Sequence, residues 1–453
     1  MSARSRNSPS TATIPPSHDH PEAAHAPEPT QCGKSRTAQG AHERPKVTIV
    51  GGGVAALQAL IAVRRLAEGR VALELITPTA EWGYRPLAVA EPFGLGEVKT
   101  YDLIQVARDH GAVLHLAGVQ SVDADAHSLS TWDGRMLPYE ILVLAVGAQP
   151  AVAVPGSVMV RGPGYTSRFR TVLRQLDERR IRRVVFAVPA GAAWPLPLYE
   201  LALMTAAHAA DRGLRKLELS LVSPEQEPLQ LFGPAASSAV RALLDERGVA
   251  FHGGRYPSEA RDGELVLVPG PNIPAERVVS LPRLRGPFLE GLPHDLEGFI
   301  PTDLHGLVEG KADVYAAGDA TTSPIKQGGV ASQQADAVAE AISARLGAPV
   351  EPRPFRPVLR GLLLTGGAPE FMRAEVSGGE DHPPAASTHA LWWPPSKIAA
   401  RWLAPYLAQR HDELEQQPAG LAVEAGAPFP ATRRRAMTGR DPDGRPALVR
   451  LET

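Results

Sequence analysis

The sequence predicts an α/β fold from two observations. Residues 47–53 form a short β-branched run that ends in a glycine-rich turn, and apolar strands alternate with helices again from about residue 181. A third observation supports this fold: a buried strand far downstream ends in Gly318-Asp319 and completes the pattern begun at the glycine turn. Together they predict two Rossmann-like three-layer (ββα/βαβ) domains, the second inserted in the first, plus a smaller C-terminal region.

Length and composition limit the class of protein. With 453 residues the chain can form two or three domains, each with its own core. A net charge of −2 gives no bulk attraction to nucleic acid, and no apolar run is long enough for a membrane-spanning helix. The sole cysteine, Cys32, excludes an intramolecular disulfide or a paired-thiol relay, and no pattern of His and Cys has metal-ligand spacing. The excess of arginine over lysine indicates a bacterial source.

Changes in composition predict where the domains begin and end. Residues 1–44 are rich in Ser, Pro, His and Ala and have no apolar stretch for a secretory signal, so we expect a disordered tail on a cytoplasmic protein. The other expected divisions are a first domain at 45–155 and 292–350, an inserted domain at 156–291, a C-terminal interface or lid region at 351–414, and a loose tail at 415–453.

The first domain begins with a strand, a turn and a helix. Residues 47–50 are of the kind buried in a parallel sheet, and the apolar, Ala-rich residues 54–66 predict a helix. The segments that follow are predicted to be a strand (71–76), a Pro-punctuated loop (77–95), a helix (100–107), sheet edges or a hairpin (116–132), a buried strand (141–145) and, after the insertion, a helix (331–346).

The inserted domain repeats a βαβαβ order, which predicts a second parallel sheet. Its predicted elements are strands at 183–188, 217–222 and 249–252, helices at 198–210 and 234–246, and an end near 279–281. The C-terminal region is less regular, with a predicted strand at 358–365, a loop at 377–387 and an apolar, aromatic segment at 391–406.

The glycine turn fits the pattern Gly-x-Gly-x-x-Gly/Ala through Gly51, Gly53 and Ala56. The first glycine permits a tight turn, and the second lets the backbone approach a pyrophosphate. The start of the following helix then offers N–H groups to the phosphates. A carboxylate is expected about 20 residues later to bind the adenosine ribose, but Thr77 occupies that place, and its hydroxyl bonds a ribose less strongly.

The downstream half of the pattern is Gly318-Asp319, followed by a loop and a helix. Asp319 could accept a hydrogen bond from a flavin ribityl hydroxyl. The next helix start and Lys326 would stabilise the negative charge of a reduced flavin, which makes Lys326 the candidate catalytic residue. A solvated loop lysine is the alternative interpretation of Lys326.

These segments resemble the glutathione-reductase-type flavoproteins, nearest the branch of sulfide:quinone oxidoreductase, flavocytochrome sulfide dehydrogenase and type II NADH dehydrogenase. The resemblance covers residues 46–346 and also includes Tyr84-Arg85-Pro86, Ala145-Val146-Gly147 and Lys326-Gln327-Gly328. It implies an FAD-binding first domain. The predicted cofactor-binding residues are Gly51, Gly52, Gly53, Ala55, Ala56, Thr77, Arg85, Pro86, Ala145, Gly147, Gly318, Asp319, Lys326, Gln327 and Gly328.

Two departures from that family bear on the activity. The redox cysteines of its sulfide-oxidising members are absent, because Cys32 lies outside the matched region. In the inserted domain, the turn after the first strand contains Pro189, Gly191 and Trp194, of which only Gly191 suits a nucleotide-binding turn. Binding of NAD(P)H is therefore doubtful.

The C-terminal segment at 391–407 has more than one interpretation. Ile398, Ala399, Trp402 and Tyr406 would share one face of a helix. Such a face suits a peripheral membrane contact, here at the inner face of the membrane, or a homodimer surface. It equally suits a lid packed over the flavin, and we favour packing.

The leading hypothesis is an FAD-dependent oxidoreductase that passes electrons from a small donor through flavin to an acceptor such as a quinone. The first alternative is an NAD(P)H-dependent flavoprotein dehydrogenase or reductase with an atypical nucleotide site. A third hypothesis is a non-catalytic, flavin-binding redox sensor, which the missing thiols would explain.

Overall fold

The computed structural model describes residues 44–160, 164–376 and 384–410. The tails predicted before residue 44 and after residue 414 lie outside these residues, as does most of the loop predicted at 377–387. Within the described residues, no helix combines the length and the apolar character needed to cross a membrane.

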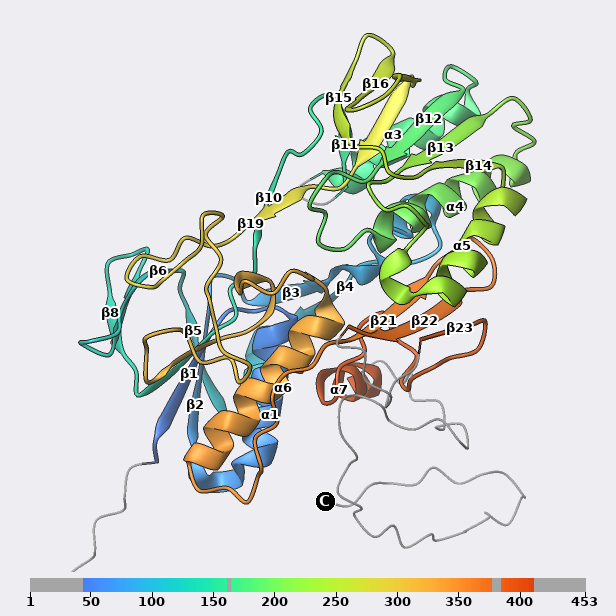
Figure 1. The fold of residues 1–453 in the computed structure, drawn as a ribbon. Coiled ribbons are helices and arrows are strands. Elements are labelled where there is room, and N and C mark those ends of the chain that lie inside the picture. The colour runs from blue at the N-terminus through green and yellow to red at the C-terminus, as the bar shows by residue number, and fades with distance from the viewer. Residues whose placement is uncertain (1–43, 161–163, 377–383, 411–453) are drawn as a thin grey trace, which may run out of the picture. The chain divides into compact units, whose positions relative to one another are not determined.

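A parallel five-stranded sheet organises the first part of the fold, in the order β20-β9-β1-β2-β5 (Figure 1). Its strands are β1 (Lys46–Val50), β2 (Ala72–Thr77), β5 (Ala112–Leu116), β9 (Ile141–Leu144) and β20 (Val314–Ala316). Strands β1, β9 and β20 are mostly apolar and buried, as expected for a parallel sheet covered on both faces. The downstream strand β20 therefore completes a sheet begun at the start of the chain.

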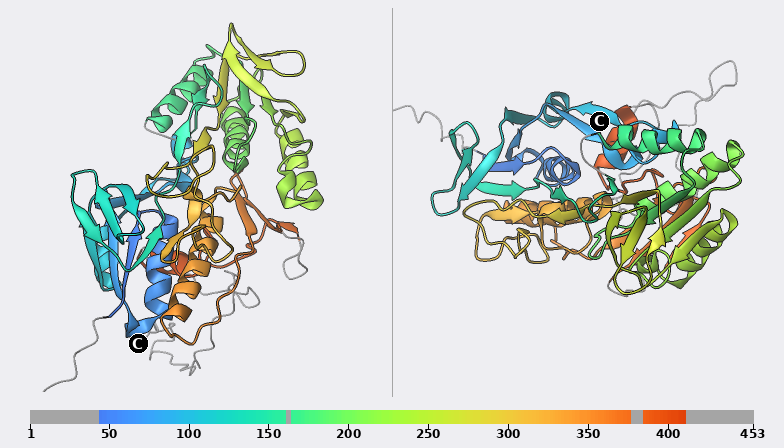
Figure 2. Two further views of the ribbon diagram at one scale, coloured as in Figure 1. Left: turned by 60° about the vertical axis from the view of Figure 1, so that its left-hand side comes forward. Right: turned by 90° about the horizontal axis from the view of Figure 1, so that it is seen from above.

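Two helices lie side by side on one face of this sheet (Figures 1 and 2), α1 (Val54–Leu66) and α6 (Gly328–Arg345). Small residues allow this close packing, and Ala56, Ala59 and Ala335 are fully buried between the layers. The opposite face carries an antiparallel sheet, β6 (Val119–Asp123), β7 (Ser128–Thr131) and β8 (Met136–Pro138). This gives the three layers that the sequence predicts.

The segment predicted as a loop at 77–95 contains regular structure. Strand β3 (Glu81–Tyr84) pairs antiparallel with β4 (Lys99–Asp102), and 3-10 turns follow at Arg85–Leu87 and Glu91–Phe93. The helix predicted from residue 100 begins only at Leu103, as α2 (Leu103–Asp109). The reason is Asp102, whose Oδ1 accepts a hydrogen bond from the N–H of Ile104 at 2.8 Å and so caps the helix.

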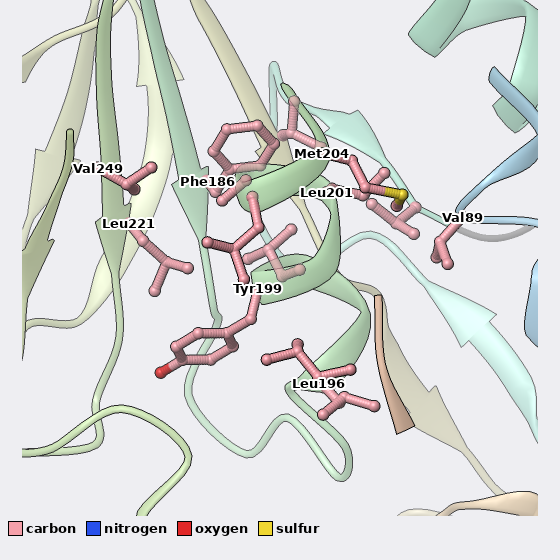
Figure 3. Close-up of a cluster of buried hydrophobic side chains, with 14 of the residues drawn as sticks. Val89, Phe186, Leu196, Tyr199, Leu201, Met204, Leu221 and Val249 are labelled. Atoms are coloured by element: carbon pink, nitrogen blue, oxygen red, sulfur yellow. The ribbon is translucent and has the colours of Figure 1, made fainter. Parts of the chain in front are cut away.

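A second parallel sheet, in the order β11-β18-β12-β13-β14, forms from the middle of the chain. Its strands are β11 (Val158–Met159), β12 (Arg183–Ala187), β13 (Glu218–Val222), β14 (Val249–His252) and β18 (Arg277–Ser280), with helices α3 (Tyr165–Asp177), α4 (Leu196–Asp211) and α5 (Pro234–Glu246). Figure 3 shows Phe186, Leu221 and Val249 of the sheet packed around α4, with Val89 of the first part close by.

Smaller sheets complete the fold. They are β3–β4, the ribbon β10 (Gln149–Ala151) with β19 (Arg283–Arg285), the sheet β15 (Pro257–Arg261), β16 (Glu264–Leu267) and β17 (Ile273–Pro274), and the sheet β21 (Val358–Leu363), β22 (Glu370–Glu375) and β23 (Ala385–Ser387). Strand β23 corrects the loop predicted up to residue 387.

The helical face predicted for the segment at 391–407 is wrong for most of its length. A helix, α7 (Leu403–Arg410), begins only at Leu403. Residues 391–402 form bends and turns and no helix. Ile398 and Ala399 are nevertheless buried within this chain, at 5% and 6% exposure. This observation favours intramolecular packing over a membrane-facing helix.

Candidate functional site

The glycine turn at residues 51–53 and the downstream segment Gly318-Asp319 lie at the same edge of the first sheet. Gly51 follows β1, Ala145 follows β9 and Gly318 follows β20, and these three strands are adjacent and parallel. The carboxyl ends of parallel strands form the crevice in which ligands of such folds bind. Segments far apart in sequence therefore lie together where a dinucleotide would bind.

The backbone at this edge requires glycine. Gly51 has φ of +134°, and a Cβ there would lie 2.3 Å from the carbonyl oxygen of Ala145. Gly318 has φ of +80°, and a Cβ there would lie 2.9 Å from the Cβ of Ala55. Both positions hold neighbouring segments at distances that any side chain would prevent.

Gly53 differs, because a Cβ on it would meet no atom within 4 Å. It is the N-cap of α1 and has no side chain to accept hydrogen bonds from the first-turn amides. The helix start therefore faces open space with its N–H groups available, which fits an anionic pyrophosphate. Ala55 and Ala56, in the first turn, are buried against the sheet and β20.

Thr77 ends β2 and is almost fully buried, at 1% exposure. A Cβ on Gly52 would lie 2.6 Å from the Thr77 Oγ1, so the hydroxyl lies directly against the glycine turn. The structure thus puts Thr77 where the ribose-binding acid was expected, with a hydroxyl in place of the carboxylate.

Three further predicted residues occupy loops. Arg85 and Pro86 form a 3-10 turn after Tyr84, and Arg85 is exposed. Gly147, after β9, has φ of +75° and no atom within 4 Å of a Cβ built on it. Tyr84 was not predicted as a site residue, yet its hydroxyl accepts a hydrogen bond from the N–H of Ile398 at 3.2 Å.

Lys326 is buried, at 8% exposure, which excludes the solvated-loop alternative. Its Nζ donates to the carbonyl oxygen of Thr321 and lies 3.9 Å from the centroid of the Phe299 ring. Burial lowers the pKa of Lys326 to about 8, although the charges of Asp319, Asp295 and Glu297 oppose the shift. Lys326 can therefore lose or regain a proton near neutral pH.

The start of α6 is organised by its own side chains. Gln327 is the N-cap, and its Oε1 accepts from the N–H of Val330 at 2.7 Å while its Nε2 donates to the carbonyl oxygen of Arg360 at 3.0 Å. Gln327 therefore positions the helix start through its side chain. A Cβ on Gly328 would lie 2.8 Å from the Ile398 Cδ1, so the C-terminal segment lies directly against this turn.

Gln334 is a site residue that sequence reasoning missed. Its Oε1 accepts from the N–H of Gly318 at 2.6 Å, and its Nε2 donates to the Thr321 Oγ1 at 3.2 Å. It thereby ties the strand end that precedes Asp319 to α6. The only sequence signal for Gln334 was an amide side chain one turn inside a predicted helix. Such residues have many structural roles, so this signal does not identify a site residue.

The corresponding turn of the second sheet is poorly suited to a dinucleotide. Trp194 packs edge-on against Phe232, with ring centroids 5.7 Å apart. Pro197 has no N–H, and the N–H of Leu198 already donates to the carbonyl oxygen of Pro195 at 3.0 Å. The first turn of α4 therefore has few amides left for phosphate.

The acid beyond the second strand of this sheet is also already bonded. Glu225 lies three residues after β13, close to the place of a ribose-binding carboxylate. Its Oε2 accepts from the hydroxyl groups of Tyr199 at 3.0 Å and Ser223 at 3.1 Å. Burial raises the pKa of Glu225. Sequence reasoning missed this residue because nothing local shows that Tyr199 reaches it.

The fold and the first site define a protein of the dinucleotide-binding class, with two Rossmann-like sheets. The glycine backbone, the open face of Gly53 and the uncapped start of α1 all fit a bound dinucleotide. A family model described as pyridine nucleotide-disulphide oxidoreductase matches residues 45–335. The chain belongs to this family and is an FAD-dependent oxidoreductase, which confirms the predicted fold class, cofactor and family. It lacks a redox disulfide, since its only cysteine is Cys32.

Individual relatives agree with the fold. Demethylphylloquinone reductase NdbB from Synechocystis sp. is 23% identical over 72% of this chain and 86% of its own length. The structure of sulfide:quinone oxidoreductase from Aquifex aeolicus is similar with a TM-score of 0.68 and 17% identity, over 82% of this chain and 96% of that one. The NDH2 of Plasmodium falciparum gives a TM-score of 0.59 and 11% identity, over 76% and 92%.

Proposed function

We propose that this flavoprotein transfers two electrons from a small donor other than NAD(P)H, through FAD, to a quinone. The observation that supports the flavin site most strongly is the meeting of Gly51, Ala145 and Gly318 at one sheet edge. A quinone acceptor is supported by the names of two relatives, demethylphylloquinone reductase and sulfide:quinone oxidoreductase.

In this proposal FAD lies in the domain formed by residues 45–155 and 292–350. The turn at 51–53 and the start of α1 bind the pyrophosphate, Thr77 bonds the adenosine ribose, and Asp319 accepts from the ribityl chain. The region of Arg85, Pro86, Ala145 and Gly147 lines the rest of the proposed FAD site. Sheet membership supports this division, because strands of the first sheet come only from these two ranges.

FAD, when bound, supplies the ability to accept two electrons and release them singly or in pairs. The contribution of the chain is electrostatic. Lys326 holds a proton at Nζ, and the start of α6 presents its positive end close by, so both stabilise negative charge at the flavin ring. Because its pKa is about 8, Lys326 is protonated for most molecules at neutral pH.

The exclusion of NAD(P)H as donor is supported by the second sheet. Trp194 packs against Phe232 beside the turn, and the Glu225 carboxylate accepts a hydrogen bond from the Tyr199 hydroxyl. The inserted domain, residues 156–291, would then serve as a structural support for the acceptor site. The NAD(P)H-dependent alternative predicts that either nucleotide bleaches the flavin anaerobically.

Purified protein tests the proposal directly. It should be yellow with bound FAD, and Asp319→Ala should weaken FAD retention. Flavin reduced chemically under anaerobic conditions should be reoxidised by a short-chain quinone analogue. Colourless protein that ignores added FAD would contradict the flavin site, and yellow protein that fails to reduce any quinone analogue would contradict the acceptor.

A further inference from the structure

Gln334 of α6 is bonded through both ends of its amide to the turn that contains Asp319. Its Oε1 accepts from the N–H of Gly318 at 2.6 Å, and its Nε2 donates to the Thr321 Oγ1 at 3.2 Å. The side chain of Gln334 is 8% exposed, and Gly318 and Thr321 are buried as well. The amide is therefore satisfied inside the protein by one short turn of the chain.

Thr321 completes a closed ring of hydrogen bonds with this amide. Its Oγ1 donates to the carbonyl oxygen of Gly318 at 3.0 Å, and its N–H donates to the same oxygen at 3.1 Å. Because the Gly318 N–H can only donate, the Gln334 oxygen must face it, and the Gln334 amino group must face Thr321. The hydroxyl proton of Thr321 is then left for the Gly318 carbonyl, so each polar atom of the ring has one role and the turn is held in one arrangement.

The ring lies between two places where the backbone is paired with other segments. Upstream, the N–H of Ala317 donates to a carbonyl oxygen at the end of β9 at 3.0 Å. Downstream, the carbonyl oxygen of Ala320 accepts from the N–H of Ile300 at 2.9 Å. Gly318 and Asp319 lie between these bonds, and here a side chain, in place of a neighbouring strand, supplies the acceptor for the Gly318 N–H.

The same turn also holds the amine of Lys326. Its Nζ donates to the carbonyl oxygen of Thr321, the residue whose side chain is bonded to Gln334. Asp319 lies inside the turn, and its charge acts on Lys326. One buried amide therefore braces the turn that carries Asp319 and that receives the amine of Lys326.

We propose that Gln334 is a positioning residue for FAD, which holds Asp319 and Lys326 in the arrangement that binds the cofactor and sets its reduction potential. This inference rests on the proposed function in placing the flavin beside these two residues. Gln334 acts through Gly318 and Thr321, to which it is bonded. A change at Gln334 should therefore alter the affinity for FAD and the potential of the bound flavin, and not the stability of the fold alone.

The affinity for FAD and the midpoint potential of the bound flavin, both measured on the full-length protein, test this role. In Gln334→Leu the buried N–H of Gly318 loses its acceptor and the turn must rearrange, so FAD should bind at least about tenfold more weakly. Lys326 stabilises the negative charge of the reduced flavin, so its displacement should also make the midpoint potential more negative. Fluorescence titration with FAD gives the affinity, and anaerobic reduction beside a reference dye gives the potential.

Gln333, the preceding residue of α6, provides the matched control. Its Nε2 donates to the carbonyl oxygen of Val358 at 2.9 Å, and its Oε1 accepts from the N–H of Val358 at 2.9 Å. It therefore joins the same helix to β21 with bonds of the same kind. Gln333→Leu should lower the melting temperature and leave the FAD affinity and the midpoint potential unchanged.

Thr321 gives a second test that does not depend on the folding of Gln334→Leu. Thr321→Val removes the hydroxyl at nearly constant volume and should weaken FAD binding, whereas Thr321→Ser keeps the hydroxyl and should restore it. Wild-type affinity and midpoint potential in both Gln334→Leu and Thr321→Val would overturn the positioning role and leave the proposed function standing. A wild type that binds FAD but reduces no quinone analogue would contradict the acceptor, while weaker FAD binding in Gln334→Leu would still support the positioning role.

Discussion

Gly318 lies against Ala55, so close that a Cβ on the glycine would be 2.9 Å from the Cβ of the alanine. Ala55 is in the first turn of α1, and Gly318 follows β20, which enters the sheet from a distant part of the chain. The contact brings the start of α1, which we propose binds the pyrophosphate, next to the residue before Asp319. In the proposed site, both segments can contact one FAD only when β20 has joined the sheet.

The two glycines of the first turn should respond differently to the same substitution. Gly51→Ala puts a methyl group 2.3 Å from the Ala145 oxygen at a φ of +134°, so it should reduce the free energy of unfolding by about 2 kcal/mol or more. Gly53→Ala has no protein atom in its way. It should leave the stability of the FAD-free protein within about 0.5 kcal/mol and weaken FAD binding at least tenfold.

Thermal unfolding and FAD titration of both variants separate these effects. If Gly53→Ala binds FAD as tightly as the wild type, then the space in front of Gly53 is not the pyrophosphate site.

Lys326 should give the FAD-free protein a distinct dependence of stability on pH. Its folded pKa of about 8 is below the ordinary 10.5, so between these values the unfolded chain holds a proton that the folded chain lacks. The free energy of unfolding must then rise with pH from about 8 to 10.5, by on the order of 3 kcal/mol. Lys326→Met removes this rise, and denaturant unfolding at several pH values measures it. A wild type and variant with parallel profiles in this range would contradict burial of the ammonium.

Much of the fold was predictable because its signals are local. Helix α1 begins at Val54 and ends at Leu66, as the apolar run after the glycine turn predicts. The start of α2 was misplaced, since Asp102 caps the helix later than its composition indicates. The segment at 396–402 was misread as helical because spacing alone suggested a face, whereas the structure has no helix there before Leu403.

The site was less predictable, because its side chains act across the chain. The glycines and Thr77 are set by the motif itself. Gln334, Gln58 and Glu225 form hydrogen bonds with residues 16, 345 and 26 positions away in the sequence. No local sequence pattern predicts such pairs. The same holds for Lys397, whose partner Glu200 is on another sheet's helix.

NADH and NADPH should fail to bleach the flavin anaerobically at a useful rate. The reasons are the Trp194–Phe232 contact in the turn and the hydrogen bond from Tyr199 to Glu225. Stopped-flow absorbance of the flavin with each nucleotide gives the measurement, and dithionite supplies the positive control. Bleaching within seconds by either nucleotide would restore the NAD(P)H-dependent alternative.

The partly buried carboxyl of Asp336, on α6, should give the free energy of unfolding a pH dependence of the opposite sign. Burial raises the pKa of Asp336 to about 7, against the opposing influence of its hydrogen bond from Gln58 Nε2 at 2.6 Å. Arg401 and Arg353 also lower this pKa, while Glu340 raises it. Asp336 therefore orients the amide of Gln58 that caps α7. When Asp336 is ionised, its burial lowers the stability of the folded protein.

Between pH 3.8 and about 7 the folded protein retains a proton that the unfolded chain has lost. The free energy of unfolding contributed by Asp336 thus falls as pH rises through this window. Asp336→Asn keeps an oxygen that accepts from Gln58 but cannot ionise. It should match the wild type near pH 4 and be more stable above pH 7, by on the order of 4 kcal/mol. Denaturant unfolding at pH 4, 6 and 8 measures the difference, and a variant less stable than the wild type at pH 8 would show that the ionised carboxylate is well stabilised by Arg401 and Arg353.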